Sequence, residues 1–403
     1  MGFTGDVPRG DTIPNSYIVV LKPTISEEEA ASHIESIHSQ PNDEVGVPSQ
    51  TAVESFSIQL SESTTSGETP PAFRGYTGTF SSTVLQSIKE SPLVDYVQPN
   101  QYIRVQDVQP APPSWGLSRI SHRGPFNPGD NNYVYDNNES GQGVTAYVVD
   151  TGIRMDHQDF GGRAIWGKTI PSGASNTDTV GHGTHVAGTL AGTKYGVAKK
   201  AKVIAVKVFP DNASSTPTSN IIQGIEWAVK DAQDRRNINS TVMNLSLGGL
   251  AGPNDKAMEH AVEAAVKAGM IVAVAAGNWG RDIKDYTPAR APNALTVGAI
   301  DRGDSMPQWS NWGQLLDLNG PGVDIVSCGI ASPSATATMS GTSMATPHIA
   351  GLVCGLRQGL RNATLPSLAY ELRLRAEGRC KVYPGHEAGT ANLAAVNVKV
   401  PSP

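Results

Sequence analysis

Five short apolar runs constrain the fold of this chain more than any other feature. They are rich in β-branched residues and span Val144–Val149, Val203–Val208, Thr241–Leu247, Met270–Ala275 and Leu295–Ala299. Apolar runs without polar alternation are typical of strands that are buried on both faces. Helical patterns at Asn220–Gln233 and Asp255–Lys267 lie between them, the second with Asn254 as predicted N-cap and Gly269 just past its end. The alternation predicts an α/β domain, a mostly parallel sheet with helices on both sides.

The first hundred residues follow a different order. Strand and helix patterns succeed one another as βαββαβ at 15–23, 26–38, 51–60, 72–80, 81–90 and 94–105. Ser26 and Glu29 have the spacing of a capping box at the start of the first helix. This order predicts a small α+β domain of the ferredoxin-like type. Residues 61–71 are predicted to form a loop, and the Pro- and Gln-containing residues 106–113 a linker.

Charge is spread unevenly over the two parts. The net charge is -6, and residues 1–107 hold 14 acidic and 5 basic side chains, a net charge of -9 that leaves +3 for the rest. Opposite charges suit two parts that bind each other, although unrelated surface compositions explain them equally well. No basic cluster indicates nucleic acid, no apolar stretch is long enough to span a membrane, and no secretory signal is visible at the N-terminus.

Three cysteines, Cys328, Cys354 and Cys380, cannot all pair within the chain. The chain is therefore not a disulfide scaffold. Cys354 is predicted to be a small buried residue, and a bridge between Cys328 and Cys380 is left open.

Three short segments carry candidate chemistry, and the first is the Val-Val-Asp-Thr-Gly segment around Asp150. It places a carboxylate at the carboxyl end of a buried strand, where open α/β sheets keep their sites. A capping role is the alternative. An aspartic protease needs two such carboxylates sharing a proton, and the chain has a single Asp-Thr-Gly.

The second segment, Gly-His-Gly-Thr-His-Val-Ala-Gly, contains His182 and His185. Its small residues allow a helix to start close against a sheet. Zinc binding by the two histidines lacks a third ligand nearby and the glutamate of a metalloprotease helix. A buried, hydrogen-bonded structural role is the better expectation for His185.

The third segment, Ser-Gly-Thr-Ser-Met-Ala-Thr-Pro-His, places Ser343 before a helix predicted at Met344–Gly359. A serine there is most often only a cap. The small flanking residues add a further possibility, because they let backbone N–H groups approach a substrate carbonyl.

In the chain order Asp, His, Ser, these three segments together resemble the subtilisin superfamily, and within it the proteinase K-like fungal branch. The resemblance covers 108–403, and Trp115–Ser121 is similar to the mature N-terminus of that branch. Residues 1–107 resemble the inhibitory propeptides that precede such enzymes. The resemblance implies a subtilisin-like three-layer domain at 108–403, a ferredoxin-like propeptide at 1–107, and a serine endopeptidase made as a self-processing zymogen.

The resemblance also assigns roles to the candidate residues. Ser343 is the implied nucleophile, His182 the general base and then acid, and Asp150 the carboxylate that orients it. The Asn278 side-chain amide and the Ser343 backbone N–H are the implied oxyanion donors. The cleft strand and primary pocket are implied at Ser246, Leu247, Gly248, Ala276 and Gly277. Since these segments hold no acidic residue, a broad preference for apolar or aromatic substrate residues is expected.

The lining of the cleft departs from the branch. Trp279 follows Asn278 where relatives usually carry a small polar residue, and it could narrow the cleft. The segment Asp211–Asn220, similar to the opposite cleft wall, carries two prolines nearby and no aromatic residue, which leaves the outer subsites open.

A structural calcium site is implied at the Pro292 and Ala294 carbonyls with the Asp317 carboxylate. No other cofactor is expected. Asn-x-Ser/Thr sequons occur at Asn138, Asn212, Asn239, Asn244 and Asn362. Asn244 lies in the cleft strand and is expected to be buried, whereas the others are compatible with a glycoprotein on a secretory route.

The expected partners are protein and peptide substrates and the chain's own propeptide, with the enzyme a monomer. An extracellular enzyme and an enzyme of the vacuolar lumen are both open. A third hypothesis is a pseudoenzyme that uses the fold only for binding. It requires the loss of a catalytic residue, and Asp150, His182, Asn278 and Ser343 are all present.

Overall fold

The computed structural model describes residues 12–41, 53–59, 72–101, 107–129, 131–252, 254–360, 371–372, 375–378, 380–382 and 389–396. The chain divides into two compact units, Met1–Arg104 and Val105–Pro403. Each unit has its own hydrophobic core. The predicted loop at 61–71 lies outside the described residues.

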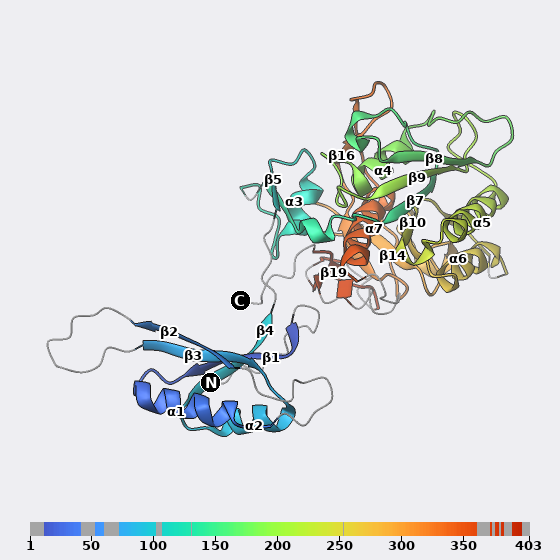
Figure 1. The fold of residues 1–403 in the computed structure, drawn as a ribbon. Coiled ribbons are helices and arrows are strands. Elements are labelled where there is room, and N and C mark those ends of the chain that lie inside the picture. Colours follow the sequence, from blue (N-terminus) through green and yellow to red (C-terminus); the bar gives the residue numbers. More distant parts are fainter. Residues whose placement is uncertain are drawn as a thin grey trace. The chain divides into compact units, whose positions relative to one another are not determined.

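The smaller unit is the predicted ferredoxin-like domain (Figure 1). Its elements are β1 (Thr12–Leu21), α1 (Glu27–His38), β2 (Val53–Gln59), β3 (Ala72–Thr79), α2 (Ser82–Glu90) and β4 (Val94–Gln101). The strands form an antiparallel sheet in the order β2-β3-β1-β4. Both helices cover one face, where Val19, Tyr76 and Ile88 are fully buried. The capping box of Ser26 and Glu29 is confirmed.

The larger unit is built on a nine-stranded sheet in the order β18-β19-β15-β14-β12-β10-β7-β9-β8. All neighbouring strands are parallel except β18 and β19. The strands are β7 (Thr145–Asp150), β8 (Ala164–Thr169), β9 (Lys202–Lys207), β10 (Thr241–Leu245), β12 (Ile271–Ala275), β14 (Leu295–Ile300), β15 (Leu318–Pro321), β18 (Glu377–Gly378) and β19 (Leu393–Ala394).

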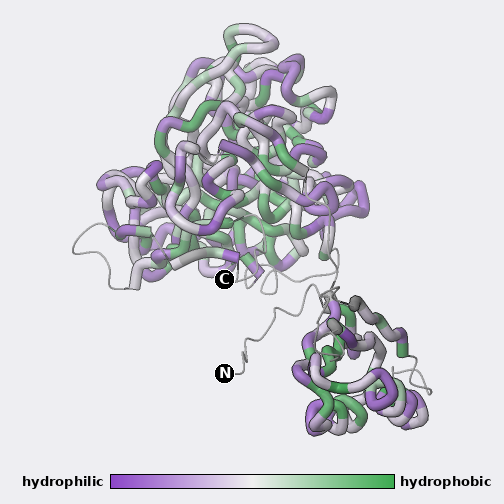
Figure 2. The backbone as a smooth tube through the Cα atoms, turned by 90° about the vertical axis from the view of Figure 1, so that its left-hand side faces the viewer, coloured by the Kyte–Doolittle hydropathy of each residue, from purple (hydrophilic) through white to green (hydrophobic). Residues whose placement is uncertain are grey.

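Helices on both faces complete the three layers. The helices are α3 (Trp115–Ser121), α4 (His182–Ala191), α5 (Thr218–Asp234), α6 (Ala257–Lys267) and α7 (Thr342–Gly359). Successive side chains of a strand point to opposite faces. Ala146 and Val148 of β7 therefore pack in the core that contains α4 and α7, while Tyr147 and Val149 pack with α5 and α6. Figure 2 shows the apolar stretches of this unit gathered in its interior.

Three two-stranded ribbons surround this sheet. They pair β5 (Asp107–Pro110) with β6 (Asn132–Tyr135), β11 (Gly249–Leu250) with β13 (Tyr286–Thr287), and β16 (Ile325–Cys328) with β17 (Thr336–Met339). The predicted linker at 106–113 is thus wrong over 107–110. Its strand pairs with residues about 25 positions further along, and Gln109 bonds Lys194 and Lys199, contacts that composition does not reveal.

Helix α6 begins later than predicted. Its N-cap is Lys256 without a side-chain cap, not Asn254. Asp255 accepts a hydrogen bond from the Gly252 N–H at 2.8 Å, and this turn delays the helix. Gly269 lies just past the helix end, as predicted, and there adopts a left-handed conformation with φ 111°.

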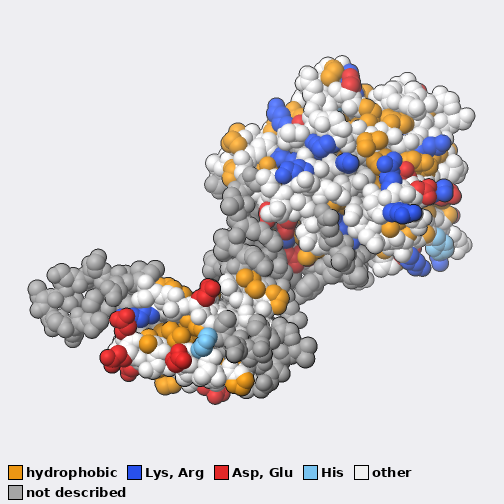
Figure 3. Space-filling model, in the orientation of Figure 1, with side chains coloured by type: hydrophobic (Ala, Val, Ile, Leu, Met, Phe, Trp, Pro, Cys, Tyr) orange, Lys and Arg blue, Asp and Glu red, His pale blue; other side chains and the backbone are white. Residues whose placement is uncertain are grey.

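The structure decides the state of the three cysteines. All three cysteines are free and buried, so no bridge joins Cys328 and Cys380, and Cys354 is fully buried. Figure 3 shows lysine and arginine side chains over the visible face of the larger unit and acidic side chains on that of the smaller unit. Among the described residues, no helix has the length and apolarity needed to cross a bilayer.

Candidate active site

The sheet order brings the ends of three neighbouring strands together. Asp150 is the last residue of β7, Ser246 follows β10, and Asn278 lies three residues beyond β12. These strands lie side by side in the order β12-β10-β7 and run parallel. Their carboxyl ends therefore meet at one edge of the sheet, where sites of open α/β sheets form.

Asp150 and His182 form a hydrogen-bonded pair at this edge. The Nδ1 atom of His182 lies 2.8 Å from Oδ1 of Asp150, which also accepts the Thr151 N–H at 2.7 Å. Asp150 is fully buried, and the side chain of His182 is 30% exposed. His182 is the first residue of α4, and Gly183 allows this close start, because a Cβ there would collide with the Gly152 carbonyl oxygen.

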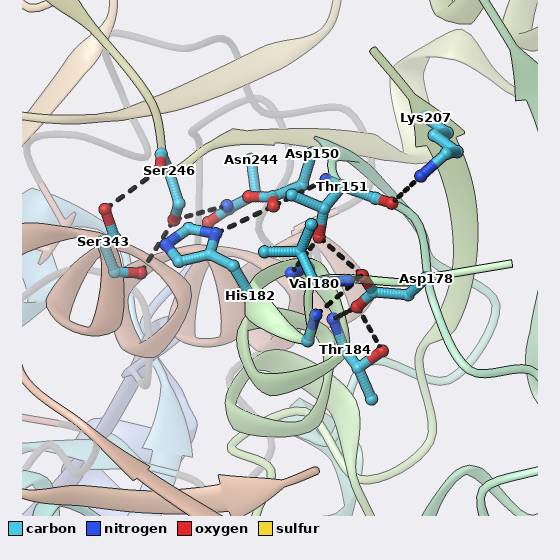
Figure 4. Close-up of polar contacts among 12 residues, drawn as sticks. Asp150, Thr151, Asp178, Val180, His182, Thr184, Lys207, Asn244, Ser246 and Ser343 are labelled. Atoms are coloured by element: carbon cyan, nitrogen blue, oxygen red, sulfur yellow. Dashed lines mark hydrogen bonds and ion pairs between the residues drawn. The ribbon is translucent and has the colours of Figure 1, made fainter. Parts of the chain in front are cut away.

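Ser343 lies on the other side of the imidazole ring. Figure 4 shows the ring of His182 between Asp150 and Ser343. Helix α7 begins at Thr342, so Ser343 stands in its first turn and not before the helix. The Ser343 hydroxyl donates to the Ser246 carbonyl oxygen at 3.0 Å, and the Ser246 hydroxyl donates to the Ser343 carbonyl at 2.8 Å. The proton of the Ser343 hydroxyl is therefore directed to the Ser246 carbonyl oxygen and not to His182.

Asn278 is held in a single orientation by Thr342. The Asn278 Oδ1 accepts both the backbone N–H and the hydroxyl of Thr342, each at 2.8 Å. A backbone N–H can be met only by an acceptor, so the amide oxygen must face Thr342. The Nδ2 amino group is therefore not used by Thr342, and Asn278 lines the same cleft as Ser343.

A cleft of about 400 Å³ joins these groups. Its lining includes Thr151, Val180, His182, Phe209, Ser214, Ser215, Thr216, Ile221, Ser246, Leu247, Gly248, Ala275, Gly277, Asn278, Trp279, Thr342 and Ser343. No Asp, Glu, Lys or Arg stands among these lining residues. The cleft is therefore lined by apolar, hydroxyl and amide side chains, with His182 as its titratable side chain.

Ala276 does not line the cleft, contrary to the prediction. It is fully buried and packs with Ile283, Tyr286 and Leu316, while Ala275 faces the cleft. Neighbouring residues at a strand end point to opposite sides, so a one-residue error exchanges cleft and core. Trp279 lines the cleft, is 51% exposed, and stacks on Tyr286 with ring centroids 4.7 Å apart.

His185 and Asn244 are buried, as expected. The His185 Nε2 lies 2.9 Å from the Ile325 carbonyl oxygen, and burial lowers the pKa of His185 to about 4. The described residues contain no group of three or more His, Cys, Asp or Glu side chains that could hold a metal.

Asn244 donates to the Ser246 hydroxyl at 2.9 Å and therefore supports the cleft strand.

Two residues at this site, Asp178 and Thr151, were not predicted from the sequence. Asp178, four positions before His182, is 5% exposed and accepts hydrogen bonds from the start of α4. Thr151 lies between Asp150 and Asp178 and bonds both. An acidic residue just before a helix is a weak capping signal, and it was not singled out because its partners come from two distant segments.

Residues 141–378 match the Subtilase family, and residues 16–106 match Peptidase inhibitor I9. The chain belongs to the subtilase family. As a subtilase it is a serine endopeptidase, and the two matches are those of a subtilisin-like protease preceded by an inhibitor-type propeptide. The predicted resemblance and fold class are confirmed.

Several fungal proteases are similar to this subtilase. Subtilisin-like protease 4 of Arthroderma benhamiae is 44% identical over 350 residues, 85% of this chain and 82% of that protein. Alkaline protease 2 of Aspergillus fumigatus is 42% identical over 85% of this chain and 71% of its own length. Cerevisin of Saccharomyces cerevisiae is 42% identical over 85% of this chain, which spans only 55% of cerevisin.

A solved structure shares the subtilase fold. The crystal structure of a cold adapted subtilisin-like serine proteinase covers 71% of this chain and 98% of its own, with a TM-score of 0.62 and 36% sequence identity.

Proposed function

We propose that Asp150, His182 and Ser343 are the catalytic triad of this subtilase. The observation that carries the proposal is the His182 ring, hydrogen-bonded to buried Asp150 on one side and facing Ser343 on the other. The Ser343 hydroxyl turns from the Ser246 carbonyl towards the Nε2 atom of His182, which takes its proton as the oxygen attacks the substrate carbonyl. His182 then protonates the leaving amine, and water hydrolyses the acyl-enzyme.

Asn278 and the Ser343 backbone N–H bind the oxyanion in this proposal. The Thr342 contacts that fix the Asn278 amide support it, because a preorganised donor costs no reorganisation during the reaction. Hydrolysis of a chromogenic peptide, blocked by a serine-directed sulfonyl fluoride, tests the active enzyme against the pseudoenzyme. Hydrolysis that survives complete labelling of Ser343 contradicts the triad.

Replacing Asn278 by alanine is expected to lower kcat by about 10²- to 10³-fold with little change in KM. The amide acts on charge that exists only in the transition state, so ground-state binding is nearly unaffected. Steady-state kinetics of the two enzymes measure the effect. An unchanged kcat means that other groups hold the oxyanion.

The pH dependence follows from His182, which must be neutral to accept the proton. Burial opposes protonation of the ring, but the charge and hydrogen bond of Asp150, with the charge of Asp178, outweigh it and raise the pKa of His182 above 6.5. We expect kcat/KM to rise with pH through a midpoint above 6.5 and to stay high in the alkaline range. A pH–rate profile from pH 4 to 10 tests this, and a maximum below pH 5 contradicts it.

We propose a broad preference for apolar and aromatic residues before the cleaved bond. The uncharged lining of the cleft supports this, with Trp279 as an aromatic wall held by Tyr286. Peptides with Phe, Tyr or Leu at this position are expected to be cleaved faster than those with Lys or Glu. Trp279→Asn is expected to lower the Phe-to-Ala ratio of kcat/KM by about 2- to 10-fold, the value of one aromatic contact. An unchanged ratio means that Trp279 does not contact the substrate residue before the cleaved bond.

We propose that the boundary between propeptide and enzyme lies at 107/108. Strand β5 supports a cut near its start, because Gln109 and its neighbours pair within the larger unit. The tail of the propeptide would bind the cleft strand Ser246–Gly248 as a product, as extended peptides add to strand edges. The segment before the cut would then inhibit the monomeric enzyme until it is degraded.

A calcium ion at Pro292, Ala294 and Asp317 is a further proposal. Asp317 accepts the Thr296 N–H at 2.8 Å, which holds its carboxylate beside the loop that contains the two carbonyls. These are the oxygen donors that calcium prefers, and the ion would brace that loop. A chelator is expected to lower the Tm of the wild-type enzyme but not of Asp317→Asn, and equal responses contradict the site.

We propose an extracellular or vacuolar-lumen enzyme. The sequon asparagines Asn138, Asn212 and Asn239 are exposed, which supports glycosylation, whereas Asn244 is fully buried. Asn362 lies outside the described residues. Loss of mass on treatment with an N-glycosidase tests this route.

A further inference from the structure

A buried carboxylate, Asp178, lies behind the Asp150–His182 pair. It is 5% exposed and accepts five hydrogen bonds, three from backbone N–H groups and two from threonine hydroxyls (Figure 4). The donors come from two segments that are separate in the sequence, the one that follows β7 and the one that begins α4. Such a group fixes the relative position of the two segments.

Thr151 is the donor from the segment that follows β7. Its N–H donates to Asp150 Oδ1 at 2.7 Å, and its hydroxyl donates to Asp178 Oδ1 at 2.9 Å. A hydroxyl has one proton, so donation to Asp178 leaves its lone pairs to accept the Gly183 N–H at 2.9 Å. Asp178 therefore sets the direction of the hydroxyl that joins Asp150's strand to His182's helix.

The second segment is the start of α4. Asp178 Oδ1 accepts the N–H groups of Val180 and Gly181 at 3.0 and 2.8 Å, and Oδ2 accepts the N–H and hydroxyl of Thr184 at 2.9 and 2.6 Å. Gly181 is the N-cap and has no side chain to fill this role. A carboxylate at this end also interacts favourably with the helix dipole.

We propose that Asp178 is a positioning residue for proton transfer, holding the segment that follows Asp150 and the segment around His182 on one anion. The proposal rests on the triad roles proposed above. Asp178 does not contact the substrate cleft, since it is absent from the lining residues. Its effect is to keep the Asp150–His182 contact at 2.8 Å while the proton moves to and from His182.

The charge of Asp178 has a second consequence. Among the described residues, the titratable groups that act on His182 are Asp150, Asp178 and His185, and the pKa of His185 is lowered to about 4. His185 is therefore neutral where the enzyme works. The two carboxylates both favour the imidazolium, so removal of one negative charge moves the pKa of His182 downwards.

Asp178→Asn is the central test. Whichever way the amide turns, its NH₂ group faces a backbone N–H, so one set of contacts is lost. We expect kcat per active site to fall on the order of 10- to 100-fold, with KM near the wild-type value, because small misplacements of reacting groups carry penalties of this size. The acidic limb of the pH–rate profile is expected to move to lower pH. Active sites are counted by end-point labelling with a fluorophosphonate, which removes differences in folding yield.

Two further variants separate positioning from stability. Asp159 is a buried carboxylate that accepts the N–H groups of Lys194 and Tyr195 and lies outside the cleft lining, so Asp159→Asn is a matched control. It is expected to lower Tm but to keep kcat per site and the pH profile. Thr151→Val removes the bridging hydroxyl and keeps the charge of Asp178, so kcat is expected to fall without a shift of the acidic limb.

The outcomes discriminate clearly. Wild-type kcat per site and pH profile in Asp178→Asn overturn the proposal, as does an equal loss of kcat in Asp159→Asn. If Asp178→Asn yields no folded enzyme, an unchanged kcat in Thr151→Val overturns it. Failure of the triad itself is recognised separately, because the wild-type enzyme would then not be labelled at Ser343.

Discussion

Replacing Ser343 by alanine is expected to lower kcat by about 10⁶-fold. In the proposed mechanism the Ser343 hydroxyl, which faces His182, is the group that forms the acyl-enzyme. Without it, His182 has no hydroxyl proton to accept. The remaining hydrolysis by water is assisted only by substrate binding and by the oxyanion donors. Cleavage of a chromogenic peptide measures the loss, and far-ultraviolet circular dichroism checks that the fold is kept.

The same variant tests the maturation of the zymogen. Wild-type enzyme is expected to yield a fragment that begins near Val108, whereas Ser343→Ala stays as one 403-residue chain. Ser340→Ala is the matched control, since Ser340 is exposed and lies three residues earlier in the same segment. It is expected to cleave itself and its substrates normally. A wild-type chain that stays uncut yet hydrolyses peptides contradicts the propeptide.

Asp150→Asn is expected to lower kcat by about 10⁴-fold without unfolding the protein. Asp150 Oδ1 accepts from both His182 and the Thr151 N–H. An amide in its place keeps the size but removes the charge, and its NH₂ group can face Nδ1. The imidazole then carries its proton on Nε2, where Ser343 needs an acceptor.

The pH–rate profile gives a second test of Asp150. Because Asp150 raises the pKa of His182, the acidic limb of the pH–rate profile is expected to move to lower pH in Asp150→Asn. Asp156→Asn is the control, because Asp156 is 62% exposed and pairs with Arg154 away from the cleft lining. A loss of less than tenfold in Asp150→Asn, or an equal loss in Asp156→Asn, contradicts the role of Asp150.

Local residue patterns predicted most of the elements that build the site. The apolar runs at Val203–Val208 and Leu295–Ala299 became parallel strands because a strand buried on both faces can hold few polar residues. Strand β8 (Ala164–Thr169) was missed, because it lies at the edge of the sheet and its side chains are only partly buried.

Contacts between distant segments were outside the reach of those patterns. The role of Asp178 depends on the tertiary structure, because the sheet brings Thr151 beside the start of α4. Residues 107–110, expected to be a linker, form a strand because a partner at 132–135 lies next to them.

The sequence by itself determined the family, the three-layer order and the candidate triad, because apolar periodicity and short motifs are properties of neighbouring residues. Only the tertiary structure decided that Ala275 and not Ala276 faces the cleft, that Ser343 donates to Ser246, and that Thr342 orients Asn278. Each of these depends on the direction of a side chain towards a residue far away in the chain. Directions of that kind are set by packing and hydrogen bonding across the sheet edge, and no local pattern encodes them.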